Sequence, residues 1–218
     1  MTVFVEAAVD TFADAVAAQA EGVHRIELCG PLNGGGTTPS AGLIARCSDA
    51  LLVSTYVLVR PRLGDFVYSD DDLEIMKRDV AVAKELGADG FVLGALTPEG
   101  DVDADRLAAV IAVASPLLVG FHRAFDRVRD QDEALELLIS LQVDHVLTSG
   151  GAKTAVDGAA RLKSLVERAG DRIGIIAGGE VTAANAAAVV SQTGVRWVHW
   201  RAFRGLPAAV ANLDGATR

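Results

Sequence analysis

The chain places acidic, basic and sulfur-bearing residues at the ends of several short apolar segments, where they could do chemistry together. Glu27 and Cys29 lie two residues apart at the end of one segment, and Arg60, Arg62 and His122 close two others. A carboxylate or an imidazole can carry a proton to or from a bound molecule, and an arginine can clamp a small anion. These residues predict a pocket in which Arg60 or Arg62 binds a small anion and Glu27 or His122 carries a proton.

A second set of residues at similar positions is expected to complete ligand binding. This set comprises Asp65, Arg123, Asp126, Ser149, Gly178, Gly179 and His199, with Glu6 nearby on the first apolar segment. Charged residues that point into a protein must be paired or must face a wet cavity, because unpaired burial costs several kcal/mol. A structural ion-pair network would also satisfy these residues, so the sequence leaves both interpretations open.

Two glycine clusters could bind an anion through backbone amides. Gly34–Gly36 precede Thr37–Ser40, where a helix is expected to begin, and Gly178 and Gly179 precede a helix expected near Thr182. Exposed amides at a helix start attract anions, and in (β/α)₈ barrels the last two loops often hold a phosphate. A mobile loop with a threonine cap and a tight glycine turn are the simpler alternatives.

The cysteines bear on whether the chain binds a metal. Cys47 lies on an apolar helix face with Leu43 and Ile44, which predicts a core residue, whereas Cys29 lies at a segment end. Copper(I) prefers soft thiolate or thioether ligands and usually needs at least two of them. Cys29 with His122 or His199 predicts at most a weak copper(I) site, and an inert thiol lining the pocket is the alternative.

The elements that must position these residues alternate between short apolar strands and helices. The strands that we expect are Val3–Val9, Arg25–Cys29, Leu52–Arg60, Gly90–Leu96, Leu117–Phe125, His145–Ser149, Ile173–Ala177 and Arg196–Arg201. Helical spacing of apolar residues separates them, as between Ser69 and Gly87. Eight such units predict a (β/α)₈ TIM barrel whose functional residues lie at the carboxyl ends of the strands.

An open doubly wound sheet is the competing architecture. It usually carries a G-x-G-x-x-G sequence after its first strand, and this chain has AAVDTF at that position. We therefore expect a single barrel domain over residues 1–218, closed by a short C-terminal helix from Leu206 to Leu213.

Composition and charge narrow the partners. The chain is 50% hydrophobic but only 5% aromatic, which is typical of a parallel sheet built from Val, Leu, Ile and Ala. A net charge of −9 argues against nucleic acid or an anionic membrane as a partner. The most apolar stretch is too short to span a bilayer, and the N-terminus lacks a basic region typical of a signal peptide. We expect a cytoplasmic protein with reduced cysteines, and exposed apolar helix faces would permit a homodimer.

Five blocks of the sequence, in order and over most of the chain, resemble the CutC family. They are RIELCGPLNGGGTTPS (25–40), VRPRLGDFVYSDDDLEIM (59–76), KELGADGFVLGALTPEGDVD (84–103), VGFHRAFDRVRD (119–130) and DHVLTSGG (144–151). The resemblance implies a cytoplasmic (β/α)₈ barrel associated with copper homeostasis. It also implies site roles at the matched positions, which are Glu27, Cys29, Arg60, Arg62, Asp65, His122, Arg123, Asp126, Ser149 and His199.

The chain departs from the family pattern at two places. Ala7 and Ala8 follow Glu6 where relatives often carry cysteines, and Trp200 and Arg201 replace two serines after His199. Three hypotheses follow. The first is a copper homeostasis protein that binds copper(I) at the barrel rim. The second is an enzyme acting on a small phosphorylated or carboxylated metabolite, and the third is a non-catalytic interaction scaffold.

Overall fold

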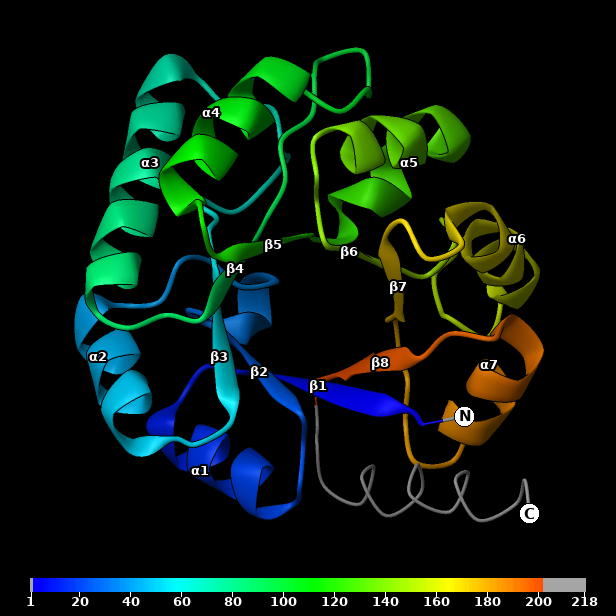
Figure 1. Ribbon diagram of the computed structural model, residues 1–218, viewed down its shortest axis with the longest axis horizontal. Helices are drawn as coiled ribbons and strands as arrows, with labels where there is room; N and C mark the ends of the chain where they lie inside the picture. The colour runs from blue at the N-terminus through cyan, green and yellow to red at the C-terminus, as the bar shows by residue number, and fades with distance from the viewer. Residues whose placement is uncertain (1, 202–218) are drawn as a thin grey trace.

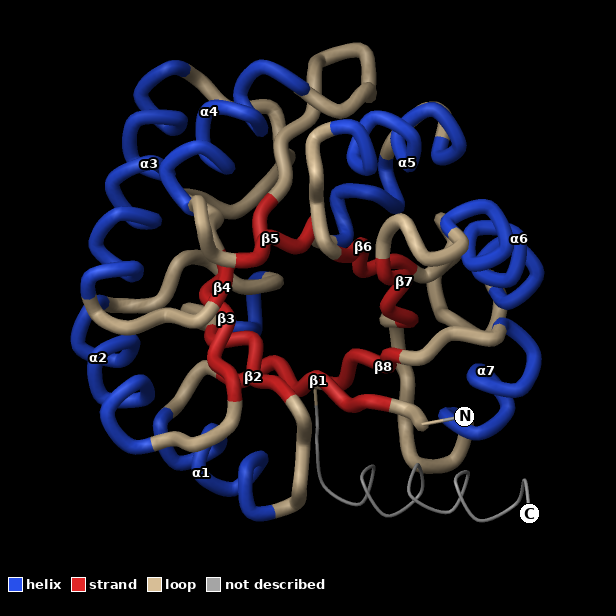
Figure 2. Tube along the Cα trace, viewed as in Figure 1, coloured by secondary structure: helices blue, strands red, loops and turns tan. Residues whose placement is uncertain are grey.

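Eight parallel strands close into a barrel in chain order in the computed structural model, which describes residues 2–201 (Figures 1 and 2). The strands are β1 (Phe4–Val9), β2 (Arg25–Leu28), β3 (Ser54–Leu58), β4 (Gly90–Leu93), β5 (Leu118–Phe121), β6 (His145–Thr148), β7 (Gly174–Ala177) and β8 (Trp197–Trp200). The predicted (β/α)₈ barrel is confirmed. The predicted C-terminal helix from Leu206 to Leu213 lies outside the described residues.

Seven α-helices in residues 2–201 form an outer ring around the strands (Figure 2). They are α1 (Phe12–Ala20), α2 (Ala41–Ala50), α3 (Asp70–Glu85), α4 (Ala104–Ala114), α5 (Gln131–Ser140), α6 (Ala159–Ala169) and α7 (Ala186–Thr193). Side-chain caps fix several helix starts. Ser69 and Asp72 form a capping box at α3, and the side chain of Asp130 accepts hydrogen bonds from two amides of α5. In this part of the chain, no helix is long and apolar enough to cross a bilayer.

Several predicted element boundaries are wrong. The strands predicted over Leu52–Arg60 and Gly90–Leu96 are shorter, at Ser54–Leu58 and Gly90–Leu93. The strand predicted over Leu117–Phe125 ends at Phe121, and a short 3₁₀ helix, η2 (Arg123–Arg127), follows it. The side chain of His122 causes this turn, because its Nδ1 accepts a hydrogen bond from the amide of Ala124. The helix after Gly36 is capped by Ser40 rather than by a threonine.

The floor of the barrel is filled by polar and aromatic side chains. Arg25, the first residue of β2, pairs with Glu6 of β1, and its guanidinium carbon lies 4.4 Å from the ring centres of both Tyr56 and Trp197. His145, the first residue of β6, lies 3.4 Å from an Arg25 nitrogen. These contacts close one end of the barrel.

Candidate functional site

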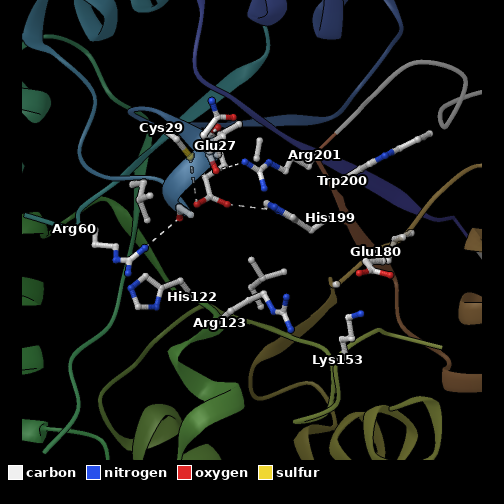
Figure 3. Close-up of a pocket in the computed structure, with 18 of the residues that line it drawn as sticks. Glu27, Cys29, Arg60, His122, Arg123, Lys153, Glu180, His199, Trp200 and Arg201 are labelled. Carbon is white, nitrogen blue, oxygen red and sulfur yellow. Dashed lines mark hydrogen bonds and ion pairs between the residues drawn. The ribbon is translucent and has the colours of Figure 1, made fainter. Parts of the chain in front are cut away.

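A cavity of about 1210 Å³ opens at the carboxyl ends of the strands, and we call it the rim cavity (Figure 3). Glu27 and Cys29 approach it from β2 and the residue after it, and His199 approaches it from β8. Arg60 and His122 follow β3 and β5 on another side. The cavity is therefore acidic along β2 and basic along the loops after β3 and β5.

Glu6 and His199 form a largely buried hydrogen-bonded pair, with Glu27 beside it and Arg25 paired with Glu6 beneath it. His199 Nδ1 lies 2.7 Å from a Glu6 oxygen and 3.5 Å from Glu27 Oε2. Burial alone would raise the pKa of Glu6, but the positive charge of Arg25 and the hydrogen bond from His199 hold it well below its ordinary value. Burial would likewise lower the pKa of His199, and the two carboxylates raise it instead. Glu6 is thus the ionised partner of Arg25 and accepts the hydrogen bond of His199.

Glu27 differs from Glu6 because it has no arginine partner. Its side chain is almost fully buried, and its Oε2 atom has no hydrogen-bond partner among the described residues. Burial raises the pKa of Glu27 from 4.5 to about 7, and the negative charge of Glu6 adds to this rise. A carboxyl group that gains and loses its proton near neutral pH is suited to acid–base catalysis.

Cys29 lines the same cavity but is poorly suited to hold copper(I). It is 1% exposed, and its Sγ lies 3.8 Å from Glu27 Oε1. Burial raises the pKa of this thiol, and the nearby carboxylates of Glu27 and Glu6 raise it further, so the metal-binding thiolate is disfavoured. The second cysteine, Cys47, is buried in the main core. One protonated thiol among carboxylates does not fit a tight copper(I) site.

Among the described residues, Glu6, Glu27 and His199 have donor atoms close enough together to hold a metal ion. One atom from each lies within 4.8 Å of the others. Carboxylate oxygens with one imidazole suit a hard or borderline cation better than copper(I). Both oxygens of Glu6 are already bonded, one to Arg25 and one to His199, so the group is neutralised by the protein itself.

His122 is held as a neutral hydrogen-bond donor, and this differs from the proton-carrying role predicted for it. Its Nδ1 accepts a hydrogen bond from the amide of Ala124, so the ring proton lies on Nε2. Burial lowers the pKa of His122 to about 3, and the charge of Arg60 contributes to this decrease. An imidazole with this pKa does not take up a proton at neutral pH. Of the two predicted proton carriers, only Glu27 has a suitable environment.

Arg60 lies beside His122 on the rim cavity, whereas Arg62 and Asp65 lie outside it. The Nη atoms of Arg60 donate to the backbone oxygens of Gly35, Gly36 and Gly64. Arg62 pairs instead with Asp65 and Asp72 at the surface. Neither Arg62 nor Asp65 lines the cavity. The arginine clamp predicted from either residue is therefore available only at Arg60.

Asp126 and Ser149 position the loop after β6 rather than contact the cavity. The carboxylate of Asp126 accepts hydrogen bonds from the side chains of Thr148 and Arg123 and from the amides of Ser149 and Gly151. Arg123 also donates to the hydroxyl of Ser149 at 2.7 Å. These bonds fix the guanidinium of Arg123, which does line the cavity.

The glycine pair after β7 does not form the predicted anion-binding helix start. The amide of Gly178 donates to the oxygen of Thr148. Helix α7 begins at Ala186 rather than near Thr182, because the side chain of Asn185 and the oxygen of Thr182 organise an intervening turn. Gly179 has a positive φ of 98° and lines the cavity, where it permits this turn.

Sequence reasoning assigned no site role to several polar residues around the cavity, although Glu180 follows the predicted end of the seventh strand. Arg25 and His145 form the floor beneath Glu6, and Lys153 and Glu180 lie at the cavity mouth (Figure 3). Arg25 could have been found, because it lies two residues before Glu27 and so faces the same way along the strand. Lys153 and Glu180 lie in loops, where no periodic pattern identifies them.

Comparisons with known proteins agree with this architecture. The sequence profile of the CutC family matches residues 3–203. A CutC family protein from Xanthomonas campestris pv. campestris (strain 8004) is 47% identical over 94% of this chain and 85% of its own length. The human copper homeostasis protein cutC homolog is 43% identical over 89% of this chain and 71% of its own length.

A solved structure gives the same result. The crystal structure of CutC from Streptococcus agalactiae superimposes with a TM-score of 0.89 at 34% identity, covering 92% of this chain and all of that one. The resemblance found in the five sequence blocks is confirmed, and the chain belongs to the CutC family.

Proposed function

We propose that this CutC family protein binds a small anionic metabolite in the rim cavity and transfers a proton to or from it through Glu27. The observation that carries the proposal is the Oε2 atom of Glu27. This atom is buried and accepts no hydrogen bond from the described residues, its nearest charged neighbour is His199 Nδ1 at 3.5 Å, and its side chain lines the cavity. An enzyme that works near neutral pH needs an acid or base whose pKa is close to that pH.

The residues around Glu27 supply the other requirements of such a reaction. Arg60 and Arg123 place positive charge on the cavity wall, which favours an anionic ligand. Glu6 and His199 fix the carboxyl group of Glu27 from the barrel side. The aromatic floor around Arg25 excludes water from below.

A ligand screen on the wild-type protein tests this proposal. We expect a thermal-shift panel of small carboxylates, phosphates and sugar acids to contain ligands that raise the melting temperature. Glu27→Gln should still bind these ligands, because it keeps the shape of the side chain, but should lose turnover by about 10²-fold or more. A panel without any stabilising anion, or full turnover in Glu27→Gln, would contradict the proposal.

A second candidate function is copper(I) binding at Cys29. It is favoured by the position of Cys29, which lines the same cavity as His199 and Glu27, and by the copper homeostasis role in the name of the human relative. An anaerobic copper(I) competition titration of the wild type and Cys29→Ala separates the two candidates. Tight one-to-one binding that is lost in Cys29→Ala would favour copper(I), whereas weak binding that the mutation leaves unchanged would favour the metabolite.

A further inference from the structure

Two buried nitrogen atoms on the wall of the rim cavity lack a hydrogen-bond partner among residues 2–201. They are Nε of Arg60 and Nε2 of His122. The residues are only 7% and 6% exposed. A buried donor without a partner is costly, so native proteins rarely keep one without a reason. Both donors belong to residues that face a space large enough for a ligand.

Arg60 and His122 together carry one positive charge. The Nη atoms of Arg60 donate to backbone oxygens, the neutral hydroxyl of Tyr68 also lies beside the guanidinium, and no described carboxylate lies within salt-bridge distance of it. His122 adds a donor without adding charge, because its Nδ1 accepts from Ala124 and its proton lies on Nε2. The site therefore offers two N–H groups and one uncompensated positive charge.

The two side chains lie next to each other (Figure 3), and both contact the ring of Phe66. The guanidinium carbon of Arg60 lies 4.9 Å from the centre of the Phe66 ring, and the imidazole centre of His122 lies 4.7 Å from it. Gly94 leaves room for the imidazole, since a Cβ atom there would lie 2.6 Å from a His122 ring carbon. These contacts hold both side chains in place before a ligand arrives.

We propose that Arg60 and His122 form the subsite for a carboxylate group of the ligand. Two N–H donors match the two oxygens of a carboxylate, and one positive charge matches its single negative charge. A phosphate monoester carries about −1.5 to −2 at pH 7 and presents three acceptor oxygens, which this pair cannot satisfy. This inference rests on the proposed function and names its substrate class: a small carboxylic acid with an exchangeable proton that Glu27 can reach.

Calorimetric titration with glycolate, pyruvate and inorganic phosphate tests the carboxylate subsite. His122→Asn is the informative variant, because asparagine can still accept the hydrogen bond from Ala124 but lacks the Nε2 donor. We expect the carboxylates to bind the wild type more tightly than phosphate, and to bind His122→Asn about 10-fold or more weakly. Arg62→Gln, which alters an arginine outside the cavity, should bind like the wild type.

A nitrogen-15 NMR spectrum of the wild-type histidines provides a test that does not depend on any variant folding. Saturating glycolate or pyruvate should shift the His122 Nε2–H resonance while the ring stays neutral. Three results would overturn the subsite. Carboxylate binding could leave this resonance unchanged, His122→Asn could bind carboxylates as tightly as the wild type, or the wild type could bind phosphate more tightly than carboxylates. In those cases the proposed function stands, whereas failure of every anion in the thermal-shift panel would remove both.

Discussion

The difference in unfolding free energy between Glu27→Gln and the wild type should shift in favour of the variant as the pH rises. Burial raises the pKa of Glu27 from 4.5 to about 7. A carboxyl group whose pKa is raised by folding costs nothing while it is protonated in both states. Its cost grows as the pH rises from 4.5 to about 7 and is constant above that, because the folded protein must then bury a charge.

The magnitude follows from this difference. Between the unfolded and the folded pKa of Glu27, each rise of one pH unit lowers the unfolding free energy by about 1.4 kcal/mol. The loss is therefore at most about 3 kcal/mol at pH 8 and under about 1 kcal/mol at pH 5. Glutamine removes the ionisation. The stability of Glu27→Gln relative to the wild type should therefore increase by about 2 kcal/mol between these two pH values.

Urea unfolding at pH 5 and pH 8 measures this effect. Glu85→Gln is a matched control, because Glu85 lies exposed on α3 away from the cavity, and its stability relative to the wild type should change little between the two pH values. An increase of the same size in both variants, or no increase in Glu27→Gln, would refute the argument that burial sets the proton affinity of Glu27.

Two further predictions concern the scaffold of the site, and urea unfolding checks both. Asp126→Asn should cost about 3 kcal/mol, because the partly buried carboxylate accepts hydrogen bonds from two chain segments; a change below about 1 kcal/mol would contradict its positioning role. Gly120→Ala should cost at least about 2 kcal/mol, because the new Cβ would lie 2.1 Å from His145 Nε2. In contrast, Gly42→Ala in α2 meets no atom within 4 Å and should stabilise by about 0.5 kcal/mol. Similar losses in both glycine variants would argue against the close packing at Gly120.

The barrel could be predicted from the sequence because the same pattern, an apolar strand followed by an amphipathic helix, repeats along the chain. Eight apolar strands separated by amphipathic helices permit few architectures, and right-handed βα connections close them into a barrel. Strand ends could not be predicted as well. The end of β5 depends on one hydrogen bond from the Ala124 amide to the His122 ring, and apolar residues on both sides of it conceal the change in backbone direction.

The common location of some candidate residues could be predicted for a related reason. The spacing of Glu27 and Cys29 places both at one strand end, so their approach to a common cavity follows from strand geometry. The different roles of Arg60 and Arg62 follow from tertiary contacts, because Arg62 finds Asp72 of α3 at the surface. Proton affinities depend on burial and on neighbours distant in the chain, as the contrast between Glu6 and Glu27 illustrates.

The most direct test of the account is solvent-deuterium exchange into a ligand of the rim cavity. A carboxylic acid that stabilises the wild type would be incubated in heavy water, and its carbon-bound protons would be followed by proton NMR with the wild type and with Glu27→Gln. We predict exchange that the wild type catalyses and that Glu27→Gln slows by about 10²-fold or more while binding is retained. Equal exchange in both proteins, or none above the protein-free rate in either, would contradict Glu27 as the proton carrier.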